Sequence, residues 1–406
     1  MTAKRAVAQA DGSFVSHLEC SATGERFPHD RLYGLSPAGA PLLIRYYLER
    51  VAAAVTKQDL LARKSDMWRL RELLPLSSRS DPVQLGEAAT PLVSLSRSAR
   101  ALGLGGLVVK DEGRLPTGSF KARGMAMAVT MARHFSVTRI AVPTAGNAGS
   151  AAAAYGARAG MEVHVFMPAD TPEANVAQIE LHGARGHRVD GLIDLCGRLL
   201  REGTAEQGWH DLSTLAEPYR IEGKKTMGLE LAEQMGWKLP DAIYYPTGGG
   251  TGFIGMWKAF AELQAMGWIG AKLPRMVAVQ SDGCRPIVDA SERGLDHVPE
   301  PWAPVTTEIP GTRVPKPLGD RLILEVIEQS KGFATSASDD EALEAQSELG
   351  RREGFAACLE GALCYAALKK DVVAGRLGTS HSVILFNTAT SLKVPRSAAA
   401  RAGIVS

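Results

Sequence analysis

Lys121 stands where a turn gives way to a predicted helix, a position in which an amine can do chemistry. It follows the turn-forming residues 116–118 and precedes the alanine- and methionine-rich segment 122–133, which favours a helix. In the first helical turn, the helix dipole disfavours an ammonium ion and lowers its pKa. We therefore predict that Lys121 acts as a nucleophile or base. The alternative is a solvated lysine, the commoner fate of this residue type.

A second segment with chemical potential is the loop of small residues at 143–150. It follows a predicted strand and opens a predicted helix, so its backbone N–H groups could bind a carboxylate or a phosphate. Asn147 adds an amide that could donate to a phenolate oxygen of a cofactor ring. Asparagine is also a preferred helix N-cap, and this structural role stays open.

A third segment is the glycine-rich loop formed by Gly248, Gly249, Gly250, Thr251 and Gly252. Glycine loses more entropy on folding than alanine, so four glycines in five positions indicate a required backbone geometry. The loop joins a predicted strand, 242–245, to a predicted helix, 253–266. This order favours a phosphate-binding nest over a simple turn.

The same glycines permit a different class of function, an NAD(P)-dependent oxidoreductase. Residues 250–255 satisfy G-x-G-x-x-G between a strand and a helix, and Asp282 follows the next predicted strand. The acid lies 32 residues beyond Gly250, whereas the motif places it roughly 20 residues on. A nest for a single phosphate accounts for the loop with less left unexplained.

The elements that would position these segments alternate between strands and helices. Apolar strand candidates at 107–110, 140–142 and 163–166 are interleaved with helix candidates at 148–159 and 174–182. This pattern predicts an α/β fold with parallel sheets and helices on both faces. In such sheets ligands bind at the carboxyl ends of strands, where the loops above fall.

Composition narrows the class of partner. The chain has 406 residues and a net charge of +2 with acids and bases interspersed, which argues against a nucleic-acid partner. Five cysteines without a recurring CxxC spacing favour a reducing compartment. No apolar run is long enough to span a membrane, so we expect a cytoplasmic enzyme acting on a small molecule.

The run Pro-Thr-Gly-Ser-Phe-Lys-Ala-Arg-Gly at 116–124 resembles the Schiff-base lysine segment of the tryptophan synthase β-like enzymes. These are fold type II enzymes that use pyridoxal 5'-phosphate. The resemblance runs from Leu18 to Lys393 and is strongest to the threonine synthases. It implies two open, mostly parallel twisted sheets flanked by helices, preceded by an N-terminal arm.

The resemblance also implies a division of the chain. The arm would cover 1–80, a large cofactor-binding domain 81–125 and 236–395, a small mobile domain 126–235, and a tail 396–406. The arm resembles a small cysteine ribbon in which only Cys20 of four expected cysteines remains. One thiolate cannot hold a tetrahedral zinc ion, so we predict no metal there. A homodimer is expected by analogy.

The resemblance assigns roles to individual residues. Lys121 would carry the cofactor, Asn147 would hold its ring oxygen and Thr388, after the predicted strand 383–386, its ring nitrogen. The loop 248–252 would bind the cofactor phosphate.

The resemblance also assigns residues to the substrate. The substrate carboxylate would lie against Thr144, Ala145, Gly146 and Ala148, and Arg220 would bind the leaving phosphate of O-phosphohomoserine. An ion pair of Arg220 with Glu217 or Glu222 is the structural alternative.

Three residues depart from the threonine synthase pattern. Glu217 stands where asparagine is usual, and Thr214 and Leu215 stand where polar phosphate-binding residues are expected. A desolvated carboxylate near a phosphate is repulsive. A β-elimination or β-replacement enzyme, such as a threonine or serine dehydratase or a cysteate synthase-like enzyme, is therefore an alternative that leaves the cofactor unchanged.

Overall fold

The computed structural model describes residues 12–393, and the chain within it forms two compact units. The first unit comprises residues 12–89, 121–238 and 254–271, and the second comprises 90–120, 239–253 and 272–393. The tail expected at 396–406 lies outside the described residues.

The second unit is built on a sheet with the strand order β12-β11-β10-β13-β5-β4. Neighbouring strands are parallel except β4, which is antiparallel to β5. The expectation of a mostly parallel sheet is confirmed. The strands are β4 (Leu92–Ser94), β5 (Gly106–Asp111), β10 (Ala242–Pro246), β11 (Arg275–Ser281), β12 (Phe333–Ala337) and β13 (Ser382–Asn387).

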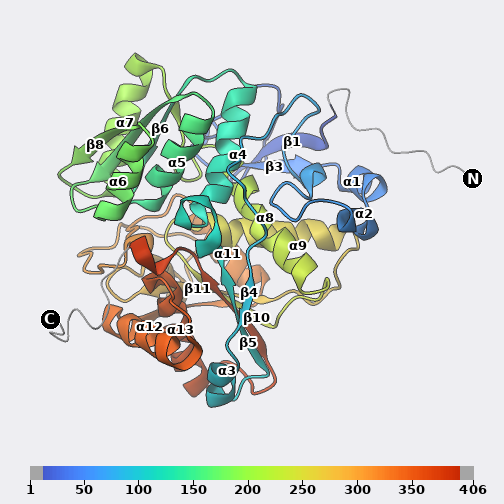
Figure 1. Ribbon diagram of the computed structural model, residues 1–406, viewed down its shortest axis with the longest axis vertical. Coiled ribbons are helices and arrows are strands. Elements are labelled where there is room, and N and C mark those ends of the chain that lie inside the picture. The colour runs from blue at the N-terminus through green and yellow to red at the C-terminus, as the bar shows by residue number, and fades with distance from the viewer. Residues whose placement is uncertain (1–11, 394–406) are drawn as a thin grey trace, which may run out of the picture. The chain divides into compact units, whose positions relative to one another are not determined.

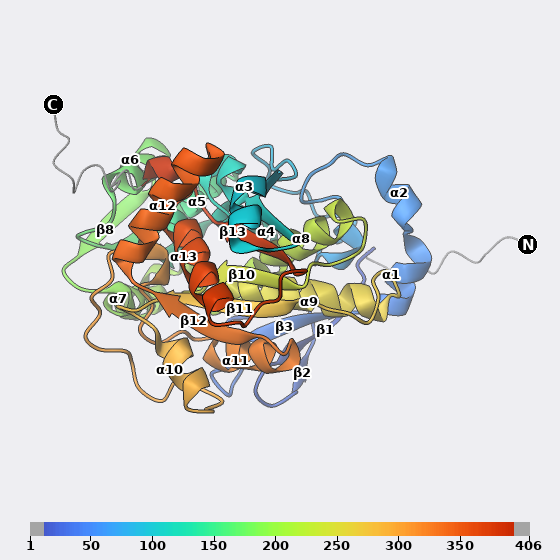
Figure 2. The same cartoon turned by 90° about the horizontal axis from the view of Figure 1, so that it is seen from below.

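Helices cover both faces of this sheet, with α13 on one side and α10 and α11 on the other (Figure 2). Because the sheet is buried on both faces, its central strands are continuously apolar rather than alternating. Ile243, Ile384 and Val108 lie in register across β10, β13 and β5. The helices of this unit are α3 (Ser96–Leu102), α10 (Pro286–Glu292), α11 (Asp320–Gln329), α12 (Asp339–Glu353) and α13 (Leu359–Val373), with 3₁₀ turns at Glu112–Arg114, Pro116–Gly118, Pro310–Thr312 and Ser391–Lys393.

The first unit contains a parallel sheet with the order β8-β7-β6-β9, seen in Figure 1 with α5, α6 and α7 around it. Its strands are β6 (Arg139–Pro143), β7 (Glu162–Pro168), β8 (Arg185–Val189) and β9 (His210–Asp211). Its helices are α4 (Lys121–His134), α5 (Asn147–Arg158), α6 (Glu173–Leu181), α7 (Ile193–Gln207) and α8 (Tyr219–Gln234). Helix α9 (Thr251–Ala265) begins in the second unit and continues in the first.

Helices α4 and α8 pack unusually closely because glycines lie at their crossing. A Cβ atom on Gly223 would come within 2.1 Å of the carbonyl oxygen of Arg123, and one on Gly124 within 3.0 Å of Lys224 Cε. Arg123 itself is fully buried at the crossing, where it donates to Thr226 Oγ1 at 3.1 Å. The two backbones therefore touch, and substitution at Gly223 would force them apart.

The arm contains a small antiparallel sheet of β1 (Val15–Cys20), β2 (Arg26–Phe27) and β3 (Leu42–Tyr46). Helices α1 (Leu48–Ala54) and α2 (Lys57–Leu61) and a 3₁₀ turn at Arg71–Leu73 follow it. The Cys20 thiol donates to the Ser36 hydroxyl at 3.1 Å, so a hydrogen bond joins the end of β1 to the loop that precedes β3. The absence of a metal there stays a prediction.

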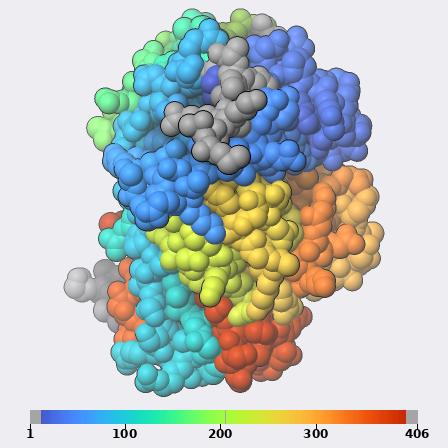
Figure 3. All heavy atoms as spheres, turned by 90° about the vertical axis from the view of Figure 1, so that its right-hand side faces the viewer, coloured from blue at the N-terminus to red at the C-terminus, as the bar shows by residue number. Residues whose placement is uncertain are grey.

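The arm is attached to helices α8 and α9 of the same unit. The Tyr46 hydroxyl donates to Glu222 Oε2 at 2.6 Å, and Lys225 Nζ lies 4.0 Å from the Tyr46 ring centroid. Figure 3 shows the arm in blue beside the ends of α8 (yellow-green) and α9 (yellow), where Lys57 Nζ lies 5.0 Å from the Trp237 ring centroid. Within residues 12–393, no helix is sufficiently long and apolar to cross a membrane.

Candidate functional site

Lys121 is the first residue of α4, as the sequence predicts. In the turn before it, Thr117 adopts a φ of +65°, which is unfavourable for a β-branched residue, and Gly118 adopts a φ of +68°, which glycine tolerates. This turn is fixed to the end of β13 by two backbone hydrogen bonds. Phe120 N donates to Thr388 O and Thr390 N donates to Gly118 O, both at 2.9 Å. The lowered pKa expected for Lys121 stays a prediction.

The glycine-rich loop has a backbone geometry that requires glycine at two of its positions. A Cβ atom on Gly248 would lie 2.3 Å from the carbonyl oxygen of Gly311, so no side chain fits there. Gly250 has a φ of +76°, which favours glycine. Helix α9 begins at Thr251, so the free N–H groups of its first turn belong to the predicted phosphate-binding residues.

Thr388 follows β13 directly and is 4% exposed. Its neighbour Asn387 fixes the strand end, because its side chain donates to Asp111 Oδ1 at 2.8 Å and accepts from Cys358 N at 2.9 Å. The Cys358 thiol lies 3.9 Å from the Thr388 hydroxyl, within the range of a weak sulfur hydrogen bond. The hydroxyl predicted to bind a ring nitrogen is therefore held in a defined place.

Three of the predicted segments meet at one edge of the sheet in the second unit. Strands β10, β13 and β5 are neighbours and parallel, and they lead into the glycine loop, Thr388 and the turn before Lys121 respectively. The carboxyl ends of parallel strands lie at the same edge, where ligands bind in such folds. The Phe120 ring also packs edge-on against Tyr245 of β10 at 6.1 Å.

The loop predicted to hold the substrate carboxylate follows β6 in the first unit. The Thr144 hydroxyl accepts from the N–H groups of Gly146 at 2.8 Å and Gly149 at 3.1 Å. Gly146 has a φ of +136°, and a Cβ atom there would lie 2.6 Å from Asn175 Nδ2. Ala145 and Ala148 complete this loop of small residues, so its backbone N–H groups can approach a ligand closely.

Asn147 is the first residue of α5 and makes no side-chain cap of that helix. Its Oδ1 atom is buried and finds no hydrogen-bond partner among residues 12–393. Buried amides normally have a partner, and the assignment of amide O and N can be exchanged by a flip. The N-cap alternative is therefore not observed, and an amide that awaits a ligand fits the geometry.

Arg220 lies near the start of α8 and is 1% exposed. Its Nη1 donates to the carbonyl oxygen of Leu212, whereas its Nε is buried without a hydrogen-bond partner in the described part of the chain. Burial lowers the pKa of Arg220 from its usual value. A buried guanidinium with an unused donor is suited to a bound anion.

Glu217 does not use its carboxylate in the way that the ion-pair alternative requires. It accepts from the backbone N–H groups of Tyr219 at 2.7 Å and Arg220 at 3.0 Å and so caps α8, while Glu222 pairs with Lys225 at 2.6 Å. Burial raises the pKa of Glu217 to about 7, against the lowering effects of Arg220 and the two N–H donors. Near neutral pH this group is only partly charged.

Some residues beside the predicted site were not identified from the sequence. The hydroxyls of Thr117 and Ser119 are buried and without hydrogen-bond partners among the described residues, immediately before Lys121. Glu360 accepts from Gly311 N at 3.0 Å and so supports the oxygen against which Gly248 packs. Burial lowers the pKa of Lys393 to about 8. Only the position of Thr117 and Ser119 within the run at 116–124 could have indicated a role.

These features fit pyridoxal phosphate. The first turn of α9 offers N–H donors next to a loop whose Gly248 packs directly on the Gly311 carbonyl. Asn147 carries an unpaired amide atom within the described part of the chain. Residues 144–148 and Arg220 belong to the first unit, and residues 248–252 and Thr388 belong to the second.

Comparisons with known proteins agree with this chemistry. The profile of the family described as "Pyridoxal-phosphate dependent enzyme" matches residues 83–388. A threonine synthase of Methanosarcina acetivorans is 34% identical over 382 residues, which cover 94% of this chain and 93% of the relative. A threonine synthase of Methanocaldococcus jannaschii is 32% identical, with 93% of each chain covered.

Solved structures show the same fold at lower sequence identity. The processed form of threonine deaminase isoform 2 from Solanum lycopersicum superposes with a TM-score of 0.62 at 18% identity, covering 74% of this chain and 84% of that one. Diaminopropionate ammonia lyase from Escherichia coli gives 0.65 at 20% identity, covering 77% and 87%. The fold type II architecture expected from the sequence is confirmed. The chain belongs to the family of pyridoxal-phosphate dependent enzymes, and within it to the threonine synthases.

Proposed function

We propose that the protein is a lyase that converts O-phosphohomoserine and water to threonine and phosphate. The similarity to threonine synthases over almost the whole chain supports this choice. The observation that carries it is Arg220, a fully buried guanidinium whose Nε has no partner within residues 12–393. An elimination enzyme for an unphosphorylated hydroxy amino acid would have no evident need for such a cation.

Pyridoxal phosphate, when bound, supplies an electron sink for the charge that develops when the Cα proton is removed. The Lys121 amine takes that proton, and its place at the start of α4 favours the uncharged form that a base needs. The Thr144 hydroxyl holds the loop after β6 in place by accepting from Gly146 N and Gly149 N, and the other N–H groups of this loop bind the substrate carboxylate. A Cβ proton then leaves, phosphate departs from Cγ, and water adds its hydroxide at Cβ. The three protons released from Cα, Cβ and water go to Cγ, Cα and the departing phosphate, which gives threonine and inorganic phosphate.

Arg220 would bind the phosphate as it departs, with Nε as a donor that has no other partner among the described residues. Glu217 is compatible with this role for two reasons. Its oxygens already accept from backbone N–H groups, and burial raises its pKa to about 7, which reduces its repulsion of a phosphate. The departure from the family pattern at this position therefore does not argue against a phosphorylated substrate.

The substrate proposal is tested by incubating the cofactor-loaded enzyme separately with O-phosphohomoserine, threonine and phosphoserine. We expect inorganic phosphate and threonine from O-phosphohomoserine without keto acid. Keto acid from threonine would instead establish a dehydratase, and consumption of phosphoserine with sulfite would establish a cysteate synthase-like enzyme. No specific observation favours either alternative.

The role of Arg220 is tested by Arg220→Lys and Arg220→Met. Both should lower kcat/KM for O-phosphohomoserine, by about 10² or more for the uncharged variant, because a charge-assisted contact to the leaving group is lost. Circular dichroism and cofactor absorbance check that each variant folds and binds pyridoxal phosphate. An unchanged kcat/KM in a folded Arg220→Met variant would remove Arg220 from the site.

The oxidoreductase alternative is distinguished by colour. The purified protein should absorb at roughly 410 nm, and borohydride should bleach this band and leave a covalent label on Lys121. A colourless protein that binds NAD(P)H would instead indicate an oxidoreductase that binds its cofactor through the segment 250–255. The family match favours the first outcome.

Three further properties belong to this proposal. We infer a homodimer, a cytoplasmic location and a small domain at 126–235 that moves against a large cofactor-binding domain at 81–125 and 236–395. The separate sheets of the two units support two domains. Light scattering tests the dimer, and small-angle scattering with and without substrate tests the movement.

A further inference from the structure

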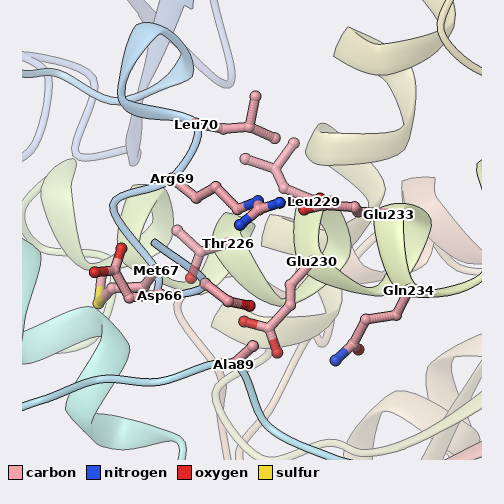
Figure 4. A pocket seen from close by; sticks show the side chains of 11 residues that line it. Asp66, Met67, Arg69, Leu70, Ala89, Thr226, Leu229, Glu230, Glu233 and Gln234 are labelled. Atoms are coloured by element: carbon pink, nitrogen blue, oxygen red, sulfur yellow. Dashed lines mark ion pairs between the residues drawn. The ribbon is translucent and has the colours of Figure 1, made fainter. Parts of the chain in front are cut away.

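A cavity of about 220 Å³ lies in the first unit between the arm and α8, and it contains none of the residues proposed for catalysis. Figure 4 shows its two walls, with residues of the segment 66–70 of the arm on one side and Leu229, Glu230 and Glu233 of α8 on the other. Both apolar and charged side chains line it. The combination indicates a ligand with both an aliphatic and a charged part.

The charges of this cavity do not balance. Glu233 pairs with Arg69 at 2.7 Å, and Glu230 pairs with the fully buried Arg123 at 3.0 Å. The side chain of a third carboxylate residue, Asp66, is only 11% exposed. It forms an ion pair with Lys64, whose side chain is 75% exposed, at a distance of 3.7 Å between Oδ2 and Nζ. A long contact to a solvated lysine contributes little. The cavity therefore carries about one uncompensated negative charge.

We propose that this cavity binds a small organic ammonium ion, with Asp66 as its principal charge partner. The aliphatic part would pack against Met67, Leu70 and Leu229, which line the same space. An anion is disfavoured because both guanidiniums already face carboxylates. The volume corresponds to about seven water molecules at ~30 Å³ each, which suits a short aliphatic amine rather than a drug-sized ligand.

The cavity is physically linked to the helix that carries Lys121. Thr226 and Glu230 both line it, and both bind Arg123, at 3.1 Å and 3.0 Å. Arg123 lies two residues after Lys121 in the first turn of α4. Binding of an ammonium ion beside Glu230 would therefore act on this turn, a consequence that rests on the proposed function of Lys121. Binding itself does not depend on that function.

The test is calorimetric titration of the full-length, cofactor-loaded protein with N,N-dimethylbutylammonium. A tertiary amine cannot condense with the cofactor aldehyde, so the heat reports a different site. We expect saturable binding with a stoichiometry of one. The neutral amide N,N-dimethylbutanamide, of similar size, should bind at least tenfold more weakly. Absence of saturable ammonium binding, or equal affinity for the amide, would overturn the proposal.

Three variants place the ligand. Asp66→Asn keeps the oxygen that accepts from Trp68 N at 3.0 Å but removes the charge, and should weaken binding about tenfold. Ala89→Leu fills the cavity and should abolish binding, whereas Lys64→Met removes a competing cation and should strengthen it a few-fold. Thermal unfolding verifies that each variant is folded. Unchanged affinity in both Asp66→Asn and Ala89→Leu would place the ligand elsewhere. Threonine synthesis, assayed separately, decides the proposed function independently.

Discussion

The two parallel sheets present their candidate site residues in different ways. At the edge of the sheet in the second unit, contacts between backbone atoms fix the geometry. Gly248 packs on the Gly311 carbonyl, and Phe120 N donates a hydrogen bond to Thr388 O. At the corresponding end of β6 in the first unit, one side chain organises the loop, because the Thr144 hydroxyl accepts from two N–H groups. The first arrangement suits a permanently held cofactor, and the second suits a substrate that must enter and leave.

The largest expected effect comes from removing the amine that both arrangements serve. Lys121→Ala should lower kcat by about 10³-fold or more, because the base and the covalent link to the cofactor are lost together. Borohydride should no longer fix the cofactor to the protein. If mass spectrometry still finds a reduced adduct on the chain, another lysine carries the cofactor.

The backbone-built edge should not tolerate even a methyl group. Gly248→Ala places a Cβ atom 2.3 Å from the Gly311 oxygen, so the loop must shift at a cost of about 1–3 kcal/mol. We expect cofactor affinity to fall at least tenfold, measured by equilibrium dialysis. Gly350→Ala is the matched control, because nothing lies within 4 Å of its Cβ position. Equal cofactor affinity in the two variants would contradict a tightly fitted nest.

The loop after β6 should respond in substrate binding rather than in cofactor binding. Thr144→Val removes the acceptor of two N–H groups and should raise KM for the amino-acid substrate about tenfold. Thr144→Ser, which keeps the hydroxyl, should behave almost as the wild type. A loss of cofactor affinity in Thr144→Val, without a change in KM, would contradict the proposal that the loop after β6 binds the substrate and the loop 248–252 binds the cofactor.

The smallest effect concerns Glu217 and is a dependence on pH. Burial raises its folded-state pKa to about 7 from a usual value of 4.5, so the protonated form stabilises the fold. This contribution is fully present below pH 4.5 and is lost as the pH rises to about 7. Denaturant unfolding should show that the free energy of unfolding of the wild type, relative to Glu217→Gln, falls across this interval. A constant difference would contradict the raised pKa.

Much of the fold follows from local sequence patterns. The apolar runs at 107–110, 242–245 and 383–386 are central strands, and residues 148–159 and 174–182 are helices to within one residue at each end. These patterns are readable because buried parallel strands are continuously apolar and the helices are rich in strong helix formers. The start of α4 at Lys121 follows from turn chemistry, whereas α9 begins at Thr251, two residues before the predicted start at 253.

Features made by contacts between distant residues could not be predicted in this way. From the sequence, the Glu217 carboxylate argued against a bound phosphate. In the structure it caps α8, and burial raises its pKa. This burial depends on the packing around Glu217, which the local sequence does not show. Asn387 joins Asp111 to Cys358 across more than 200 residues of sequence, and no local pattern marks it. The charge imbalance at Asp66 likewise appears only when the arm lies against α8.

The close crossing of α4 and α8 at their glycines limits how these two helices can move. Lys121 begins one of these helices and Arg220 lies in the first turn of the other, and Gly223 brings the two backbones into direct contact. A displacement of either helix must carry its neighbour along. Because Arg123 and Gly223 lie on opposite sides of the domain boundary inferred at residue 125, this contact would have to break if the boundary were the hinge. We therefore expect the hinge to lie before Lys121, so that the amine and the Arg220 guanidinium keep their spacing when the domain moves.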